Sequence, residues 1–258
     1  MYRQKAVCEA EGVPFASKLD IMIEMIREFI PVPDTATHVL LDSWYAAKKV
    51  WQAARERGFS ITCGIRSNRP LRIDDPNSDK GWRWQKLSDY AAQLRADAFT
   101  QLSWPGSERQ VYVHVISTRI RRLYRCQLIC IRETLDGQTK FWVSSDLEAD
   151  METLLGHIGQ RWDIEVLFAD VKELLGLDQY QVINADAIHR FWVLVMMAYG
   201  FLEHERSRLQ QEQGRHVTIG DACRHVQRAH WSRFLDWLHH RFVSEKAMPS
   251  ELHSLLLI

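Results

Sequence analysis

The chain has 258 residues, of which 46% are hydrophobic and 10% aromatic, so it can bury a large core. Charged residues at 26% and ten tryptophans exclude a disordered or collagen-like chain. The 33 Lys and Arg residues balance the 33 Asp and Glu residues, and this net charge of zero excludes a uniformly basic protein of the histone class.

Cysteine usage and hydropathy predict a soluble, cytoplasmic protein. The five cysteines are sparse, odd in number and without metal-binding spacing, which is typical of reduced thiols in a cytosol. The sequence opens without a basic and apolar leader. Its longest apolar run, residues 191–202, falls short of the roughly 20 residues that cross a bilayer, and we expect it to form a buried helix.

The start of the chain predicts an α/β core. Apolar residues at intervals of three and four predict an amphipathic helix over residues 17–30. Residues 38–42 are a short apolar run that ends in Asp42, as expected of a buried strand. Residues 45–57 predict a second helix, which a glycine ends, and residues 59–65 predict a second strand. This strand–helix–strand order favours parallel pairing of the two strands.

The middle and the end of the chain differ in character. Residues 66–145 combine turn residues with β-type runs, and Asp136 and Gly137 mark a hairpin near the end of this segment. Beyond it, apolar spacing predicts helices over residues 151–175, 185–210 and 219–242. The predicted fold class is therefore α/β, interrupted by a β-rich segment and followed by a helical C-terminal part.

Two places in this outline could carry chemistry. At about 100° per residue, Arg161, Glu165 and Lys172 fall within about 40° of one another on the helix predicted over residues 151–175. By helix arithmetic alone, this stripe favours a solvated salt bridge, which contributes about 0.3 kcal/mol. Asp42 is either an N-cap for the following helix or a functional carboxylate at the carboxyl end of a strand.

Short motifs around these residues follow one another in a fixed order. They are the segment 41–49 around Asp42, Ser67-Asn68-Arg69, Arg161-Trp162-x-Ile164-Glu165, and the segment 175–182. Together they resemble the DDE transposases of bacterial insertion sequences, in the branch with a Tyr-x2-Arg-x3-Glu-x6-Lys signature, over residues 2–203. Arg161, Glu165 and Lys172 match its spacing, whereas Ile158 occupies the place of the signature tyrosine.

The resemblance implies a ribonuclease-H-like fold in which three carboxylates bind two Mg²⁺ or Mn²⁺ ions. The implied reaction is cleavage at transposon ends, followed by transfer of the 3′-hydroxyl strand to target DNA. By motif matching, Asp42 is the second acid and Glu165 the third, and both are expected catalytic residues and metal ligands. Arg161 and Lys172 are expected to bind DNA phosphates.

The resemblance also implies partners and a location. Double-stranded DNA, at the transposon ends and at the target, is the expected partner, bound by a homodimer or by a pair with full-length transposase. The expected location is the bacterial cytoplasm, at the nucleoid when DNA is bound.

Two basic clusters offer further DNA contacts. Seven basic residues and a single acidic one lie between Lys48 and Arg72. The second cluster comprises Arg119, Arg121, Arg122 and Arg125. A solvated surface is the alternative for each cluster, but the resemblance favours DNA. The residues that we assign to DNA binding in the first cluster are Lys48, Lys49, Arg66 and Arg69.

Four tryptophans of the β-rich segment have two interpretations. They are Trp82, Trp84, Trp104 and Trp142. Core packing is favoured over stacking on an unpaired base near the cleavage point.

The first of the three acids is not recognisable in this sequence. The implied fold places it on a strand ahead of residues 17–30, where Glu9 and Glu11 lie in a polar stretch, while Asp20 belongs to the helix itself. We therefore expect an N-terminally truncated transposase that alone neither cleaves nor joins DNA, because two carboxylates make a poor two-ion site. The rival hypothesis is a non-catalytic remnant, or a DNA-binding or inhibitory partner of a full-length transposase.

The expected organisation follows from this comparison. It comprises the remaining part of a ribonuclease-H-like core with the second acid (1–65), a β-rich insertion (66–145), the glutamate helix and the following core helix (146–210), and a C-terminal helical segment (211–258).

Overall fold

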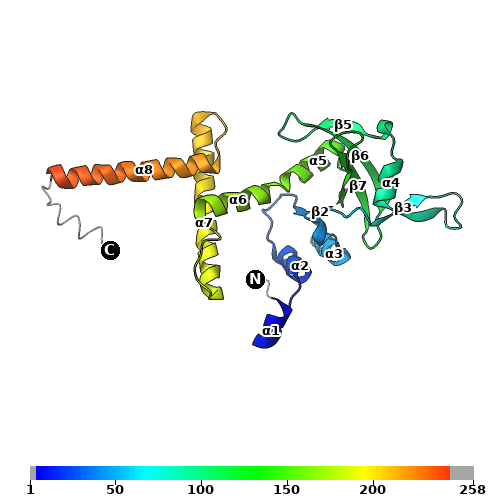
Figure 1. Cartoon of the computed structure of the whole chain (residues 1–258), viewed down its shortest axis with the longest axis horizontal. Coiled ribbons are helices and arrows are strands. Elements are labelled where there is room, and N and C mark those ends of the chain that lie inside the picture. Colours follow the sequence, from blue (N-terminus) through cyan, green and yellow to red (C-terminus); the bar gives the residue numbers. More distant parts are fainter. Residues whose placement is uncertain (1–3, 245–258) are drawn as a thin grey trace. The chain divides into compact units, whose positions relative to one another are not determined.

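The computed structural model describes residues 4–244, and the chain divides into two compact units, Met1–Asp163 and Ile164–Ile258 (Figure 1). The first unit is a mixed α/β structure, and the second is helical.

A six-stranded sheet in the order β1-β2-β8-β7-β6-β5 forms the centre of the first unit. Its strands are β1 (His38–Leu41), β2 (Ser60–Gly64), β5 (Thr100–Ser103), β6 (Gln110–Arg119), β7 (Arg125–Arg132) and β8 (Lys140–Ser144). The predicted parallel pairing of the first two strands is confirmed, since β1 and β2 run parallel in register from His38 opposite Ser60. The remaining neighbours pair antiparallel, and the hairpin predicted at Asp136 and Gly137 joins β7 to β8.

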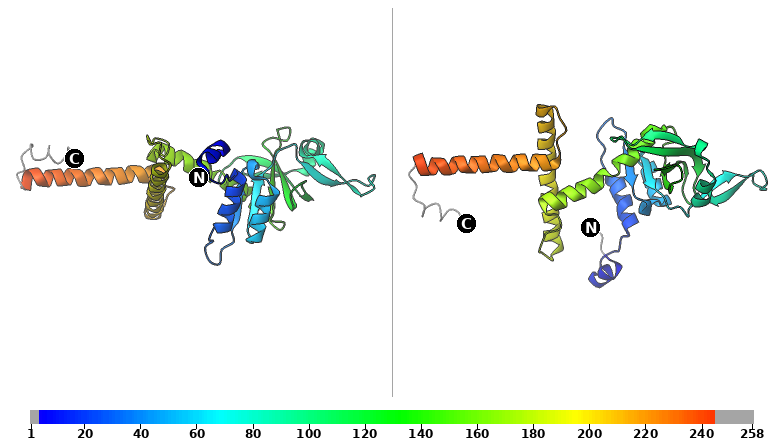
Figure 2. Two further views of the ribbon diagram at one scale, coloured as in Figure 1. Left: turned by 90° about the horizontal axis from the view of Figure 1, so that it is seen from below. Right: turned by 45° about the horizontal axis from the view of Figure 1, so that its top comes forward.

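The β-rich segment contributes four of its strands to the same sheet as β1 and β2. The exception is a two-stranded ribbon of β3 (Pro70–Asp74) and β4 (Trp82–Lys86), which projects from the sheet (Figure 2). On this ribbon, Trp82 and Trp84 meet edge to face with ring centres 5.4 Å apart, and the guanidinium of Arg72 lies over Trp82.

Helices cover both faces of the sheet. They are α2 (Lys18–Glu28), α3 (Lys48–Glu56), α4 (Leu87–Gln93) and α5 (Met151–Gln160), whereas α1 (Lys5–Glu11) lies away from the sheet (Figure 1). Two short 3-10 turns are η1 (Ser43–Tyr45) and η2 (Ala96–Ala98). The helix predicted over residues 17–30 is α2, which begins with a capping box between Ser17 and Asp20. It lies beside α3 (Figure 2).

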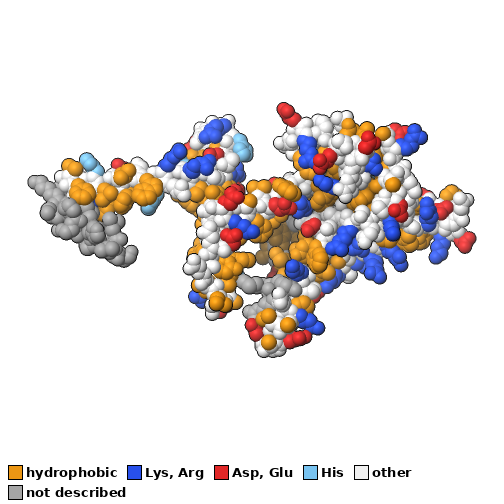
Figure 3. Space-filling view, viewed as in Figure 1, with side chains coloured by type: hydrophobic (Ala, Val, Ile, Leu, Met, Phe, Trp, Pro, Cys, Tyr) orange, Lys and Arg blue, Asp and Glu red, His pale blue; other side chains and the backbone are white. Residues whose placement is uncertain are grey.

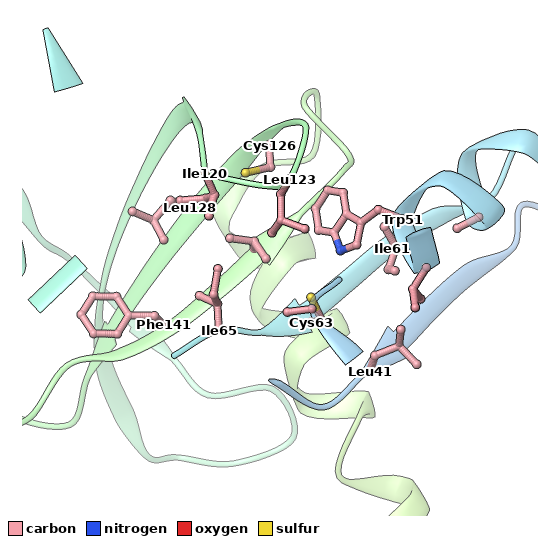
Figure 4. Packing of buried hydrophobic residues seen from close by; sticks show 14 of the residues in the cluster. Leu41, Trp51, Ile61, Cys63, Ile65, Ile120, Leu123, Cys126, Leu128 and Phe141 are labelled. Atoms are coloured by element: carbon pink, nitrogen blue, oxygen red, sulfur yellow. The ribbon is translucent and has the colours of Figure 1, made fainter. Parts of the chain in front are cut away.

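The side chains of β7 alternate between two cores, because successive residues of a strand point to opposite faces of the sheet. Cys126, Leu128 and Cys130 join the cluster that α2, α3 and α4 cover (Figure 4). Ile129 and Ile131 join a second cluster beneath α5. Burial raises the pKa of the Cys126 and Cys130 thiols to about 12, so both are poor nucleophiles at neutral pH.

Strand β1 lies at one edge of the sheet, and its first residue, His38, contacts a histidine of α5. The rings of His38 and His157 of α5 lie 3.7 Å apart between centres, and His38 Nε2 lies 2.9 Å from Thr62 Oγ1. Burial, together with the charge of His157, lowers the pKa of His38 from 6.5 to about 4, although the nearby carboxylate of Asp146 opposes the shift.

This pair predicts acid sensitivity of the first unit. Between pH 6.5 and about 4 the unfolded chain binds a proton at His38 that the folded chain excludes, so stability should fall as the pH falls through this window. Urea unfolding at pH 7 and pH 5 measures the loss, and His38→Gln should make it smaller. The exposed His216→Gln variant is the control, and an equal loss in all three proteins would contradict the assignment to His38.

The second unit consists of α6 (Asp163–Leu175), α7 (Ala185–Gln213), α8 (Ile219–His239) and a final π-helical turn (His240–Ser244). The single helix predicted over residues 151–175 is wrong, because α5 ends at Gln160 and a turn separates it from α6. The glycines at 156 and 159 weaken the helix just before this turn. Arg161 therefore caps α5, whereas Glu165 and Lys172 belong to α6, so the three do not form a stripe on one helix.

The prediction that residues 191–202 form a buried helix is also wrong in part. The segment is helical within α7, but Leu194, Met197 and Phe201 are exposed, while Val195 and Leu202 are buried. The run is apolar around the whole helix, and a helix packed on one side buries only one stripe. Hydrophobic side chains are visible along α7 and α8 in Figure 3. Among residues 4–244, no helix combines the length and apolar content of a membrane span.

Candidate nucleic-acid and metal site

Asp42 follows the last residue of β1 and is exposed. Its Oδ1 accepts the backbone N–H of Ser43 at 2.5 Å, and it thereby caps the short 3-10 turn Ser43–Tyr45. The N-cap interpretation is thus correct for this turn but wrong for α3, whose N-cap is Ala47. One short local contact leaves the exposed carboxylate well placed for a ligand at the end of the strand.

A pocket of about 330 Å³ brings Asp42 and Arg161 together. Hydroxyl and amide side chains of the wall add oxygen atoms, and they belong to Ser43, Ser67, Gln138 and Thr139. The guanidinium of Arg161 lies over the ring of Trp142, 5.6 Å from its centre. Oxygen donors beside a carboxylate are the ligands that Mg²⁺ prefers.

Arg132 fixes the loop that forms part of this wall. Its Nε donates to Thr139 Oγ1, its Nη1 to the carbonyl of Leu135 and its Nη2 to the carbonyl of Ala91, at 2.7 to 2.8 Å. The first two bonds hold the loop of the hairpin between β7 and β8, and the third connects Arg132 to α4, so Thr139 is fixed by a hydrogen-bond network.

A larger pocket of about 690 Å³ shares Trp142 and Arg161 with the first. Trp104 also lines it, beneath the guanidinium of Arg109. The predicted core packing of these two tryptophans is confirmed, since both pack against the cluster beneath α5. On the rim, the hydrogen bond from Lys140 and the charge of Arg109 lower the pKa of Glu133.

A groove of about 670 Å³ lies next to the Asp42 pocket, because Ser43 lines both. This groove is strongly basic. Its arginines are Arg66, Arg69, Arg121 and Arg122. The sequence placed these residues in two separate clusters, and the structure joins them. The turn after β6 is attached to β3 by a bridge between Ile120 and Leu71 and by the Arg121 N–H, which donates to the carbonyl of Pro70 at 2.8 Å. Lys and Arg side chains are numerous on the face of this unit shown in Figure 3.

A family model for the transposase DDE domain matches residues 16–201. The chain belongs to this transposase family. The match includes Asp42 and Glu165, and the family implies an enzyme of the polynucleotidyl-transferase type that binds DNA and uses divalent metal ions. A search of curated proteins gave no match.

Several residues that we assigned to DNA binding in this DDE domain also have partners within the fold. Lys49 forms an ion pair with Asp20, and this hydrogen bond is the main reason that the pKa of Asp20 falls to about 2. The ammonium of Lys48 lies over the ring of Tyr124, and Arg69 donates to the carbonyl of Ala46. Their contacts hold α3 and the turn after β1 in place.

Glu165 and Lys172 of the DDE domain are exposed on α6 in the second unit. Of the predicted residues Asp42, Arg161, Glu165 and Lys172, Asp42 and Arg161 line one pocket of the first unit. Across the part of the chain that the structure describes, no group of three or more His, Cys, Asp and Glu side chains is placed to bind a metal ion.

Sequence reasoning missed Trp44 as a residue of the basic groove, and it missed the backbone conformation of Arg122, a residue that it did place in the second basic cluster. Trp44 exposes 60% of its surface, and the guanidinium of Arg66 lies 5.8 Å from its ring centre. Arg122 has a φ of 63°, a left-handed conformation that usually requires glycine. The position of Trp44, two residues after the aspartate that ends a strand, was a signal that could have identified it. No sequence pattern indicated the left-handed backbone of Arg122.

Proposed function

We propose that this chain is the catalytic part of an insertion-sequence transposase, with Asp42 and Glu165 as metal ligands. The observation that carries the proposal is the exposed carboxylate of Asp42 at the end of β1, in one pocket with Arg161, within a transposase family. On this proposal the sheet around β1 and β2 is a ribonuclease-H-like core, residues 66–145 an insertion, and residues 146–210 carry the glutamate helix.

Each residue then has a defined part in phosphodiester transfer. Mg²⁺ or Mn²⁺, when bound, supplies activation of a water or 3′-hydroxyl and stabilises the leaving oxygen. Asp42 and Glu165 provide carboxylate ligands for it. Arg161, which lines the pocket beside Trp142, binds a DNA phosphate through its planar guanidinium. Lys172 adds a point charge for a second phosphate.

We further propose that the chain alone neither cleaves nor joins DNA, and that it acts with a partner. The basis is that only two of the three carboxylates that the resemblance implies are recognised, Asp42 and Glu165. Among the described residues, no group of three or more His, Cys, Asp and Glu side chains is placed to bind a metal ion. The alternative function favoured by the same observation is a DNA-binding partner that pairs with a full-length transposase, either complementing or inhibiting it.

Metal binding is testable without catalysis. Fe²⁺ in place of Mg²⁺, with ascorbate and peroxide, cuts a polypeptide next to the bound ion. We expect cuts near residues 42 and 165 that excess Mg²⁺ suppresses and that Asp42→Asn abolishes. Asp79→Asn, which changes an exposed aspartate outside the pockets, is the control. Cuts at neither position, or cuts unaffected by Asp42→Asn, would refute the metal site.

Nuclease activity is a separate prediction. With Mg²⁺ or Mn²⁺, the wild-type chain should nick DNA no faster than Asp42→Ala. Nicking above that control would contradict the proposed incompleteness and leave the metal site standing.

A further inference from the structure

The turn after Asp42 holds Trp44 in a fixed, exposed position. Tyr45 N–H donates to the carbonyl of Asp42 at 3.0 Å, and Arg69 donates to the carbonyl of Ala46. The backbone of Gly64 lies close beneath, since a Cβ there would be 3.4 Å from the Cβ of Ser43. The turn therefore holds the indole ring of Trp44 in solvent, close to the carboxylate of Asp42. In this position the ring does not contribute to the hydrophobic core.

The surroundings of Trp44 are cationic. Four arginines line the groove, and none of the described residues that line it is acidic. Arg122 keeps its guanidinium there despite a left-handed backbone that a glycine would adopt without strain. Both observations indicate a ligand that carries several negative charges.

We infer that this groove binds an unpaired DNA strand next to Asp42, with one base stacked on Trp44. Guanidinium groups match phosphates, whereas an exposed indole matches the flat face of a base. In an intact duplex the flat face of each base is covered by the neighbouring base pairs. Duplex DNA could therefore bind the arginines through its phosphates, but none of its bases could stack on Trp44. The inference rests on the proposed function, because a strand at the reaction centre is what a DDE domain acts on.

Binding to two DNA probes by the full chain tests this inference. One probe is a fully paired duplex, and the other is the same duplex with a short unpaired bubble. The wild type should bind the bubble about tenfold more tightly than the duplex. Trp44→Ala should remove this preference and leave duplex binding within about twofold, and Trp44→Phe should retain most of it because phenylalanine also stacks.

Matched variants separate the possible results. Trp231→Ala removes a tryptophan that is also 60% exposed, but in the second unit, and should bind as the wild type does. Equal losses on both probes for Trp44→Ala, or no loss, would overturn the inference. So would loss of the preference in Trp142→Ala but not in Trp44→Ala, since the unpaired base would then occupy the other pocket. If the wild type binds neither probe, the proposed function fails; if it binds both equally, only this inference fails.

Discussion

Trp51→Ala is expected to lower the free energy of unfolding by about 3–5 kcal/mol, the cost of truncating a large buried side chain. Trp51 is 2% exposed on α3 and packs in the cluster with Leu41, Ile61 and Cys63 of β1 and β2 (Figure 4). The cavity would form directly beneath the strands that position Asp42, so the site should be lost together with the fold.

Urea unfolding followed by circular dichroism measures this effect, and Trp44→Ala is a close control. Both variants lose the same side chain from the same part of the chain, but Trp44 is 60% exposed. Its removal should change stability by less than about 0.5 kcal/mol. Similar losses in the two variants would show that the cluster does not surround Trp51 as described.

Replacement of Arg66, Arg121 and Arg122 together by alanine is expected to weaken DNA binding by about two orders of magnitude at moderate salt. Each arginine that binds a phosphate contributes a charge-assisted hydrogen bond and releases a counterion. The slope of log K against log salt should therefore become shallower by about 0.9 for each phosphate that the variant no longer neutralises. Binding titrations at several salt concentrations measure both quantities.

The control for this triple variant removes the same charge elsewhere. Arg215, Arg228 and Arg233 are exposed in the second unit, and their replacement by alanine changes the net charge equally. If that control loses as much affinity as the groove variant, total charge rather than the groove determines binding.

The sequence predicted those parts of the fold that depend on local pattern. The run that ends in Asp42 and the apolar residues 59–65 formed adjacent parallel strands, because continuous apolar runs joined by a helix have few other solutions. The hairpin between β7 and β8 was likewise predictable, because the sequence Asp136-Gly137 is typical of a tight turn.

Features that depend on distant pairing could not be predicted. The basic groove exists because Ile120 bridges Leu71, which brings Arg121 and Arg122 beside Arg66, and no local pattern encodes that pairing. The break before α6 escaped prediction for a different reason. Apolar periodicity continues across the turn at residues 161–162, so the period alone cannot show where the backbone leaves one helix and begins another.

The left-handed backbone of Arg122 has a consequence for how this position can vary. Glycine there would relieve roughly 1–2 kcal/mol of steric conflict, partly offset by its greater freedom in the unfolded chain, but it would remove a guanidinium from the groove. Selection for stability alone and selection for DNA binding therefore act in opposite directions at this residue. A lineage that no longer needed the groove would be free to drift toward glycine, so the residue found at this position in a relative would record which pressure had prevailed.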